Sequence, residues 1–302
     1  MKISITHTTR LDYTADVVEG VMDVRLGPRS DRHQRWDRFE LRANPTASVR
    51  RYTDGFGNAA HLITIARPHR FIEVVSRSEI ETFLADPFVL PPVAPPPLGP
   101  SDRADYLSPS PLVEPHPDLA GIAAPHRPAT PADTFDAVRA LMDYVYSHFT
   151  YEQHVTSVAT TVPDVLACRT GVCQDFAQVL IGLCRAVDIP ARYVSGYIVV
   201  AGQYQAQRSG GQSQRQSQSQ SQSQSGEPGP SRGAGASHAW VEAFTPTHGW
   251  RGFDPTNNLV ATANHVKMAI GRDYSDVAPT RGTFRGAAEE RLAVEVITAR
   301  LD

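Results

Sequence analysis

The chain is poor in cysteine, with three in 302 residues, at positions 168, 173 and 184. An odd number does not suit a framework of disulfides, so we expect free thiols. Free thiols persist in a reducing compartment, and the sequence therefore predicts a cytoplasmic protein. A zinc site built from Cys168, Cys173 and His238 is excluded by pattern, because the cysteines have C-x4-C spacing and no second compact ligand pair exists. We expect neither a metal nor a cofactor.

Long hydrophobic runs and an excess of charge are lacking as well. No stretch of about 18 apolar residues could span a membrane, and the N-terminal residues 1–7 alternate in character without the apolar core of a signal peptide. The formal net charge is −3 and the isoelectric point is about 6.4, so no basic field favours nucleic acid or anionic lipid. We expect no nucleic-acid partner and no membrane; the sequence carries no signal for an oligomeric state.

The length suits two domains with separate cores. Residues 1–85 alternate apolar and polar over short runs separated by turns, which predicts an N-terminal antiparallel β-sandwich. Residues 86–130 are rich in proline and form a predicted connector that is partly docked. Residues 131–302 form a second domain of mixed helices and strands. It is interrupted at about 203–236 by a Ser/Gln-rich insertion, which we expect to be disordered because it lacks apolar residues.

A helix is predicted to begin at Cys173. Apolar residues from Phe176 to Val187 recur at the spacing of one helix face, Gly171 precedes them, and Pro190 follows. Cys173 then lies in the first turn, where free backbone N–H groups and the helix macrodipole stabilise a thiolate. Cys184 falls on the apolar face of the same helix, and Cys168 precedes the helix, so both are predicted to pack without a chemical role.

A hairpin is predicted to bring His238 and Asp254 together. Residues 237–244 read as a strand, residues 245–249 as a turn, and residues 250–254 as the returning strand. With the hairpin centred on Pro246, His238 faces Asp254 and Glu242 faces Trp250. Facing side chains are about 4.5–5.5 Å apart at Cβ, which is within hydrogen-bonding reach. Cys173, His238 and Asp254 together provide a nucleophile, a base and an orienting carboxylate.

Four segments in this order resemble the bacterial transglutaminase-like superfamily. They are Gly171-Val172-Cys173-Gln174-Asp175-Phe176-Ala177, Ile189-Pro190-Ala191-Arg192-Tyr193-Val194-Ser195-Gly196-Tyr197, Ser237-His238-Ala239-Trp240-Val241-Glu242 and Gly252-Phe253-Asp254-Pro255-Thr256-Asn257. The resemblance continues into His265-Val266, residues 271–277 and Arg281-Gly282. At the N-terminus, Arg25-Leu26-Gly27-Pro28 and Asp54-Gly55-Phe56-Gly57-Asn58 are similar to the β-rich region that usually precedes that domain.

The resemblance implies an α+β fold: the β-sandwich followed by a papain-like core, with the nucleophile on a helix and the His and Asp on an antiparallel sheet. It implies Cys173, His238 and Asp254 as the catalytic triad. Eukaryotic members use an upstream Trp to hold the oxyanion, and no Trp lies between Trp36 and Trp240 here. The Cys173 N–H is one expected donor. Gln174 and Trp240 are expected to line the site or contact the substrate.

Three functions are compatible with this pattern. The one we favour is a cysteine peptidase or amidase, in which a thioester formed from a protein or peptide substrate is hydrolysed by water. In the second, an amine accepts the acyl group, as in a protein-glutamine transglutaminase. In the third, the fold serves as a binding or scaffold module without catalysis. Reactivity of the Cys173 thiol separates the first two functions from the third.

Overall fold

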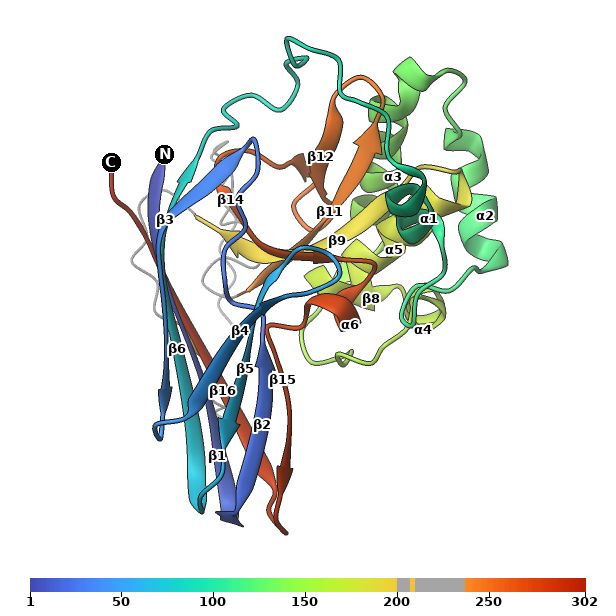
Figure 1. The fold of residues 1–302 in the computed structure, drawn as a ribbon. Coiled ribbons are helices and arrows are strands. Elements are labelled where there is room, and N and C mark those ends of the chain that lie inside the picture. The colour runs from blue at the N-terminus through green and yellow to red at the C-terminus, as the bar shows by residue number, and fades with distance from the viewer. Residues whose placement is uncertain (200–206, 210–236) are drawn as a thin grey trace, which may run out of the picture.

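The structure is a computed structural model that describes residues 1–199, 207–209 and 237–302. Two antiparallel sheets form a long sandwich, and a third antiparallel sheet lies above it with helices packed on one side (Figure 1). The fold is therefore mixed α/β, with N-terminal antiparallel sheets and a second, helix-bearing part, as predicted. The predicted insertion at about 203–236 lies outside the described residues, apart from the short strand at 207–209.

The larger sheet of the sandwich has the strand order β10-β16-β1-β6-β3, and the smaller has the order β15-β2-β5-β4. Strand β1 has one buried face: Ile3 and Ile5 pack with residues of β9 and β14 in the second part, and Leu11 packs in the core between the two sheets of the sandwich. The strands are β1 (Lys2–Val17), β2 (Glu19–Val24), β3 (Gln34–Asn44), β4 (Ser48–Thr53), β5 (Ala59–Ile65), β6 (His69–Thr82), β10 (Gln207–Ser209), β15 (Thr280–Arg285) and β16 (Glu290–Arg300).

The C-terminal strands β15 and β16 belong to the sandwich, whereas the sequence analysis placed residues up to 302 in the second domain. β16 pairs along β1 from Ile3↔Arg300 to Tyr13↔Glu290, and the backbone N–H of Leu301 donates to the carbonyl of Lys2 at 2.8 Å. Both chain ends consequently lie close together at one end of the sandwich (Figure 1). Local alternation predicts a strand but does not identify its partner, which explains the difference.

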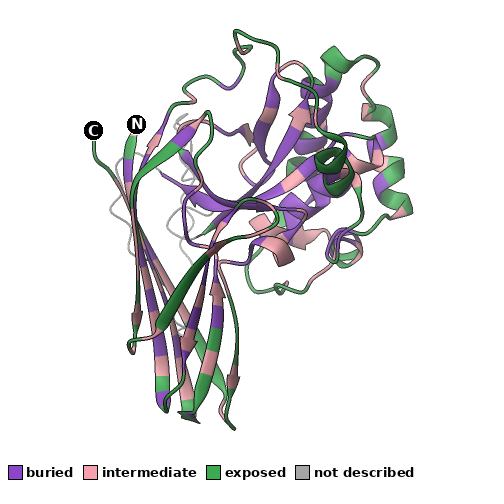
Figure 2. Ribbon diagram, in the orientation of Figure 1, coloured by how far each residue is buried: buried purple, intermediate pink, exposed green. Residues whose placement is uncertain are grey.

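The second part is built on a sheet with the order β13-β12-β11-β9-β14. Helices α3 and α5 pack against it and share one apolar core with it, where buried residues concentrate in Figure 2. The strands are β9 (Ala191–Ile198), β11 (His238–Thr245), β12 (Gly249–Asp254), β13 (Leu259–Val260) and β14 (His265–Gly271), with a separate parallel pair β7 (Thr150–Tyr151) and β8 (Thr170–Gly171). The helices are α1 (Pro100–Leu107), α2 (Pro117–Ala123), α3 (Thr134–His148), α4 (Val162–Cys168), α5 (Cys173–Ala186) and α6 (Tyr274–Val277), with 3-10 turns at Ala124–His126 and Pro131–Asp133.

Two side-chain amides of the sandwich bind the outer edge of β14. Gln34 donates to the carbonyl of Lys267 at 2.7 Å and accepts from its N–H at 2.8 Å. Asn58 makes the same pair of bonds with Ile270, at 2.8 and 2.9 Å. Each side-chain amide thus makes the two hydrogen bonds that a residue of a neighbouring strand would make. Backbone N–H and C=O groups at the open edge of the sheet are paired in this way. These bonds fix the sandwich against the sheet that carries His238.

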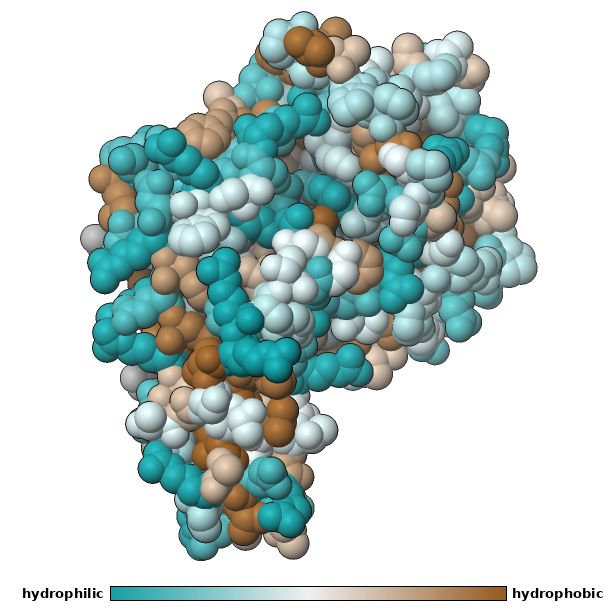
Figure 3. All heavy atoms as spheres, viewed as in Figure 1, coloured by the Kyte–Doolittle hydropathy of each residue, from teal (hydrophilic) through white to brown (hydrophobic). Residues whose placement is uncertain are grey.

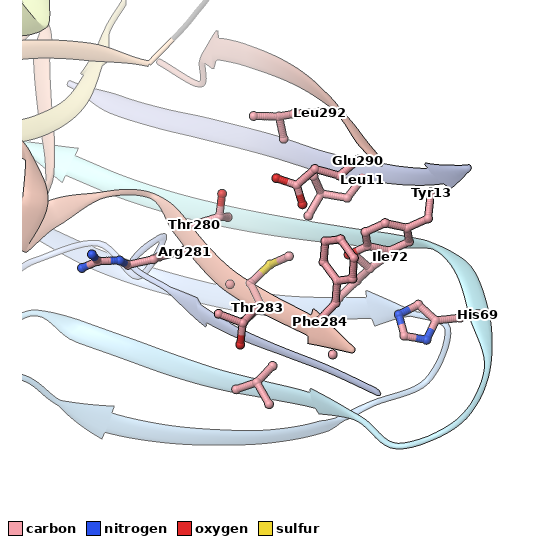
Figure 4. Close-up of a pocket in the computed structure, with 14 residues that line it drawn as sticks. Leu11, Tyr13, His69, Ile72, Thr280, Arg281, Thr283, Phe284, Glu290 and Leu292 are labelled. Atoms are coloured by element: carbon pink, nitrogen blue, oxygen red, sulfur yellow. The ribbon is translucent and has the colours of Figure 1, made fainter. Parts of the chain in front are cut away.

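The sandwich contains a cavity of about 110 Å³ between its two sheets (Figure 4). Leu11 and Ile72 of the larger sheet and Phe284 of the smaller sheet line it, and every other lining residue belongs to the sandwich as well. Figure 3 shows hydrophobic side chains gathered over the same lower part of the molecule. This cavity contains none of the predicted site residues. Among the described residues, no helix combines the length and apolar character needed to cross a membrane.

Candidate active site

Cys173 is the first residue of α5, so the predicted position in the first helical turn is confirmed. The first N–H groups of a helix have no intrahelical acceptor, and the positive end of the macrodipole lies there as well. The thiol is partly exposed and packs beside the apolar core, so it is accessible from one side. The helix continues with Phe176, Ala177, Val179 and Leu180, all of which are fully buried and anchor its position.

Asp175 stabilises the backbone immediately before the nucleophile. Its Oδ2 accepts the N–H of Val172 at 2.8 Å and the hydroxyl of Thr156 at 2.6 Å. The carboxyl group is buried, and burial raises its pKa above the ordinary value despite these two bonds. A Cβ at Gly171 would lie 2.7 Å from Asp175 Oδ2 and 2.8 Å from Asp175 Cβ. The close approach therefore requires glycine two residues before Cys173.

His238 and Asp254 form a hydrogen bond in the core of the second part. His238 Nε2 lies 2.9 Å from Asp254 Oδ2, and both side chains are completely buried. His238 begins β11 and Asp254 ends β12, so the two neighbouring strands of one hairpin deliver them. The sequence prediction that this hairpin brings the two side chains within hydrogen-bonding distance agrees with this geometry.

The predicted register of the hairpin is wrong by two residues. Glu242 pairs with Gly252, and Trp250 pairs with Phe244. The hairpin is centred on Thr247, because Gly249 has a φ of 72° and pairs with Thr245 across the turn. Glycine adopts left-handed backbone readily, so Gly249 suits a three-residue loop. This loop places the centre of the hairpin at Thr247, one residue after the predicted centre at Pro246. His238 and Asp254 are therefore diagonal neighbours across the hairpin and not direct partners.

The carboxylate of Asp254 accepts hydrogen bonds on both oxygens. Oδ1 accepts the backbone N–H groups of Thr256 and Asn257, at 2.9 and 3.2 Å. Oδ2 accepts the side-chain amide of Asn257 at 2.8 Å in addition to His238. His265 Nε2 lies 3.5 Å from the same oxygen. With this set of donors the carboxylate is held in one orientation, since rotation would break several bonds together.

The charged groups in this cluster shift one another's pKa values. Burial alone would lower the pKa of His238, but Asp254, followed by Cys173, raises it to about 10. Burial opposes ionisation of Asp254, yet the imidazoles of His238 and His265 hold its pKa well below the usual range. Burial keeps the pKa of His265 below its ordinary value, which favours its neutral form. The arrangement therefore stabilises an imidazolium at His238 that faces both a carboxylate and a thiol.

The two ring nitrogens of His238 have different surroundings. Nε2 faces Asp254, whereas Nδ1 is buried and has no hydrogen-bond partner among the described residues. Cys173 interacts with this imidazole strongly enough to contribute to its raised pKa. Which nitrogen carries the proton follows from the bonding: a proton on Nε2 is held by Asp254, and Nδ1 remains free to exchange a proton with the sulfur.

The other predicted site residues lie nearby in different environments. Trp240 stacks on His238 with ring centroids 6.2 Å apart and is only 2% exposed, so it packs beside the site and leaves little surface for a substrate. Gln174 is partly exposed and donates to the carbonyl of Val158 at 3.3 Å. Cys184 is fully buried, which raises its pKa to about 12, as expected for a packing residue. Cys168 is exposed at the end of α4.

His265 and Thr156 are the members of the cluster that sequence reasoning missed. His265 lies in a segment quoted above for its resemblance, but nothing in that segment indicated a contact with Asp254. It contacts Trp240 edge-on at 5.2 Å and accepts the N–H of Thr262 at Nδ1, which leaves the proton on Nε2. Thr156 lies in a polar loop with no motif. Both contacts depend on the folding of distant segments.

Comparison with known proteins gives a consistent family relationship. Residues 123–255 match the "Transglutaminase-like superfamily", and residues 3–81 match the "Bacterial transglutaminase-like N-terminal region". The "Uncharacterized protein Rv2569c" of Mycobacterium tuberculosis is 30% identical over 95% of this chain and 89% of its own length. The "Uncharacterized protein ML0607" of Mycobacterium leprae is 28% identical over 99% of each chain.

A solved structure shows the same fold. It is described as "a Putative Cysteine Protease from Cytophaga hutchinsonii", and it matches all of this chain and 92% of its own chain with a TM-score of 0.71 at 21% identity. The match extends over the sandwich and the helix-bearing part together, so the two parts occur in the same arrangement in both proteins.

Proposed function

The chain belongs to the transglutaminase-like superfamily, and within that family we propose that it is a cysteine enzyme that hydrolyses carboxamide or peptide bonds through a thioester. The observation that carries the proposal is the buried pair of His238 Nε2 and Asp254 Oδ2 at 2.9 Å, with Nδ1 unpaired and Cys173 acting on the same imidazole. An imidazole bound on one nitrogen and open on the other is what a general base next to a thiol requires.

The proposed reaction starts from the pair in which the Cys173 proton already resides on His238 Nδ1, so that a thiolate faces an imidazolium. Asp254 stabilises the imidazolium through Nε2–H and fixes the ring orientation. The thiolate sulfur then bonds to the substrate carbonyl carbon, and the carbonyl oxygen gains the negative charge. The backbone N–H of Cys173, in the first turn of α5, is the protein's donor to that oxygen.

In the second half, Nδ1–H protonates the departing amine or ammonia as the carbon–nitrogen bond breaks, which leaves an acyl group on sulfur. His238 next removes a proton from water, the hydroxide attacks the thioester carbonyl, and the carboxylic acid leaves with regeneration of the thiol. Hydrolysis is proposed because the thiol of Cys173 is partly exposed, so water reaches it directly.

We further propose that the protein works in the cytoplasm, because the nucleophile must remain a free thiol. The three cysteines are all unpaired in the structure.

The direct experiment measures which product forms. A peptide carboxamide is incubated with the protein, and the release of ammonia is compared with formation of the free acid, with and without an added primary amine. Equal amounts of ammonia and acid, unaffected by the amine, support hydrolysis. Incorporation of the amine at the expense of the acid indicates a transglutaminase. Selective alkylation of Cys173 with no turnover on carboxamides, esters or peptides would indicate a scaffold.

A further inference from the structure

A short loop packs against the helix start that carries the nucleophile. It spans residues 152–161, between β7 and α4, and is called the 152–161 loop below. The backbone N–H of Glu152 donates to the carbonyl of Gly171 at 2.9 Å. Thr156 donates to Asp175 at 2.6 Å, and the amide of Gln174 donates to the carbonyl of Val158 at 3.3 Å. The loop therefore contacts residues immediately before and after Cys173.

The first residues of the loop, 152–154, are polar and exposed, whereas residues 155–161 carry no charged side chain and expose two valines. Val155 is 45% exposed and Val158 is 61% exposed, and Ala159 lies beside them at the surface. Residues 155–163 contain no charged side chain, in a chain of which 20% is charged. Both valines are thus largely exposed on a loop that is bonded to the start of the helix carrying Cys173. Exposed apolar groups on a loop held by a rigid scaffold are typical of a ligand contact.

The loop is also organised before any ligand binds. Ser157 N–H donates to the hydroxyl of Thr160 at 2.9 Å, and the N–H of Thr160 donates to the carbonyl of Ser157 at 3.1 Å. Together with the Thr156–Asp175 bond, these contacts fix the turn that presents Val155 and Val158. A preorganised apolar surface loses little conformational entropy on binding, so contact with it contributes to affinity.

We propose that the 152–161 loop is the specificity wall of the site, and that Val155 and Val158 bind an apolar side chain of the substrate next to the carbonyl attacked by Cys173. The wall selects peptides with a residue such as leucine at this position. It rejects glutamate, because a carboxylate placed against two valines would lose its hydration without gaining a partner. This inference rests on the proposed function of the same site and specifies its substrate class.

Equilibrium binding of peptides to the Cys173→Ala variant tests the wall separately from catalysis. The probes are three peptide amides that differ only in the residue preceding the amide: leucine, glycine or glutamate. Titration by calorimetry should give a Kd for the leucine peptide about 10-fold or more below the other two, the discrimination expected of a small apolar pocket. Equal Kd values, or no measurable binding of the leucine peptide, would overturn the proposal.

Two aspartate variants in the Cys173→Ala background locate the preference. Val155→Asp and Val158→Asp should each raise the Kd of the leucine peptide to within threefold of that of the glycine peptide (about threefold being the scatter expected for exposed substitutions). Val49→Asp is the matched control, since Val49 is 43% exposed on β4 of the sandwich, and it should leave the leucine preference intact. A preference that survives both loop variants, or that Val49→Asp abolishes equally, contradicts the assignment.

Turnover by the chain with Cys173 intact separates this inference from the proposed function. A leucine preference in binding, lost in the loop variants, together with no turnover of any peptide, would retain the wall and reject the hydrolase. Cys173-dependent turnover with equal kcat/KM on all three peptides would retain the hydrolase and reject the wall. Both proposals together require a higher kcat/KM for the leucine peptide that falls in Val155→Asp and Val158→Asp.

Discussion

His238 reaches the carboxylate of Asp254 diagonally across the hairpin, with Nε2 2.9 Å from Oδ2. Val241 and Phe253 are the last paired residues of the ladder on this side, so direct continuation of the register would place Trp240 opposite Asp254. Trp240 packs its ring against the imidazole from this position. The hydrogen bond therefore requires the His238 side chain to extend along the strand toward Asp254. The Trp240 ring packs against one side of the imidazole in that position.

Replacing Asp254 by asparagine should preserve the shape of the side chain and reverse the direction of its hydrogen bond with His238. Both oxygens accept donors, so an amide N–H₂ in the place of Oδ2 would face the donor groups of His238 and Asn257. His238 would then accept at Nε2 and carry its proton on Nδ1, the wrong tautomer for a base that must take the proton of Cys173. We expect Asp254→Asn to lower kcat by about 10²–10⁴-fold, by analogy with serine triads. Steady-state kinetics on any amide the protein accepts measures the effect, and full activity would show that Asp254 does not orient the base.

Removal of the sulfur should abolish acyl transfer without unfolding the protein. Cys173 is partly exposed at the first position of α5, where alanine and serine are sterically tolerated. We expect Cys173→Ala and Cys173→Ser to lose turnover and to keep the melting temperature of the wild type. Cys168→Ser is the matched control, because Cys168 is exposed and lies five residues earlier; it should retain activity. Loss of activity in the control alone would move the nucleophile to Cys168.

Local patterns predicted the helices and strands near the site, and long-range partners could not be predicted in the same way. The apolar spacing from Phe176 onward correctly gave the start of α5 at Cys173. The hairpin was predicted, but its register depends on the positive φ of Gly249. The pairing of β16 with β1 joins opposite ends of the chain, so no local pattern indicates it.

Glu242 also has partners that its local sequence does not indicate. The sequence analysis placed it on a strand opposite Trp250 and gave it no charged partner, yet it is buried and paired with Arg192 at 2.6 Å and with Lys267. Lys267 also binds Asp31 of the sandwich at 2.6 Å. These partners come from three separate segments, and only the folded chain brings them together. Lys267 and Arg192 hold the pKa of Glu242 down to about 2, against its burial.

The pH dependence of stability should report the charge on His238. Its folded pKa is raised to about 10, above the unfolded value of about 6.5. The stability that this shift contributes is fully present below about pH 6.5 and is lost as the pH rises through about 10. The free energy of unfolding in urea, measured for the wild type and for His238→Gln, should therefore differ most near pH 6 and converge toward about pH 10. A difference that is constant with pH would mean that His238 is neutral in the folded protein.

Gly171, two residues before Cys173, should not tolerate replacement by a residue with a side chain. In Gly171→Ala the new Cβ would meet Asp175 at 2.7–2.8 Å, and Asp175 is buried and cannot move aside. We expect a loss of about 1–3 kcal/mol in the free energy of unfolding, the usual cost of overpacking. Gly121→Ala is the control: it lies in α2 with no atom within 4 Å of the new Cβ, and it should be neutral or stabilising. Equal effects of the two variants would show that the contact with Asp175 is not a constraint.

The most direct measurement of the central claim is the mass of the protein during turnover. The wild type is mixed with an activated ester or amide of a short peptide, quenched in acid, and analysed intact and after proteolysis. We predict a covalent acyl group on Cys173 that hydroxylamine removes, and no such adduct in Cys173→Ala. Turnover without an adduct on Cys173, or an adduct confined to Cys168 or another residue, would contradict the account.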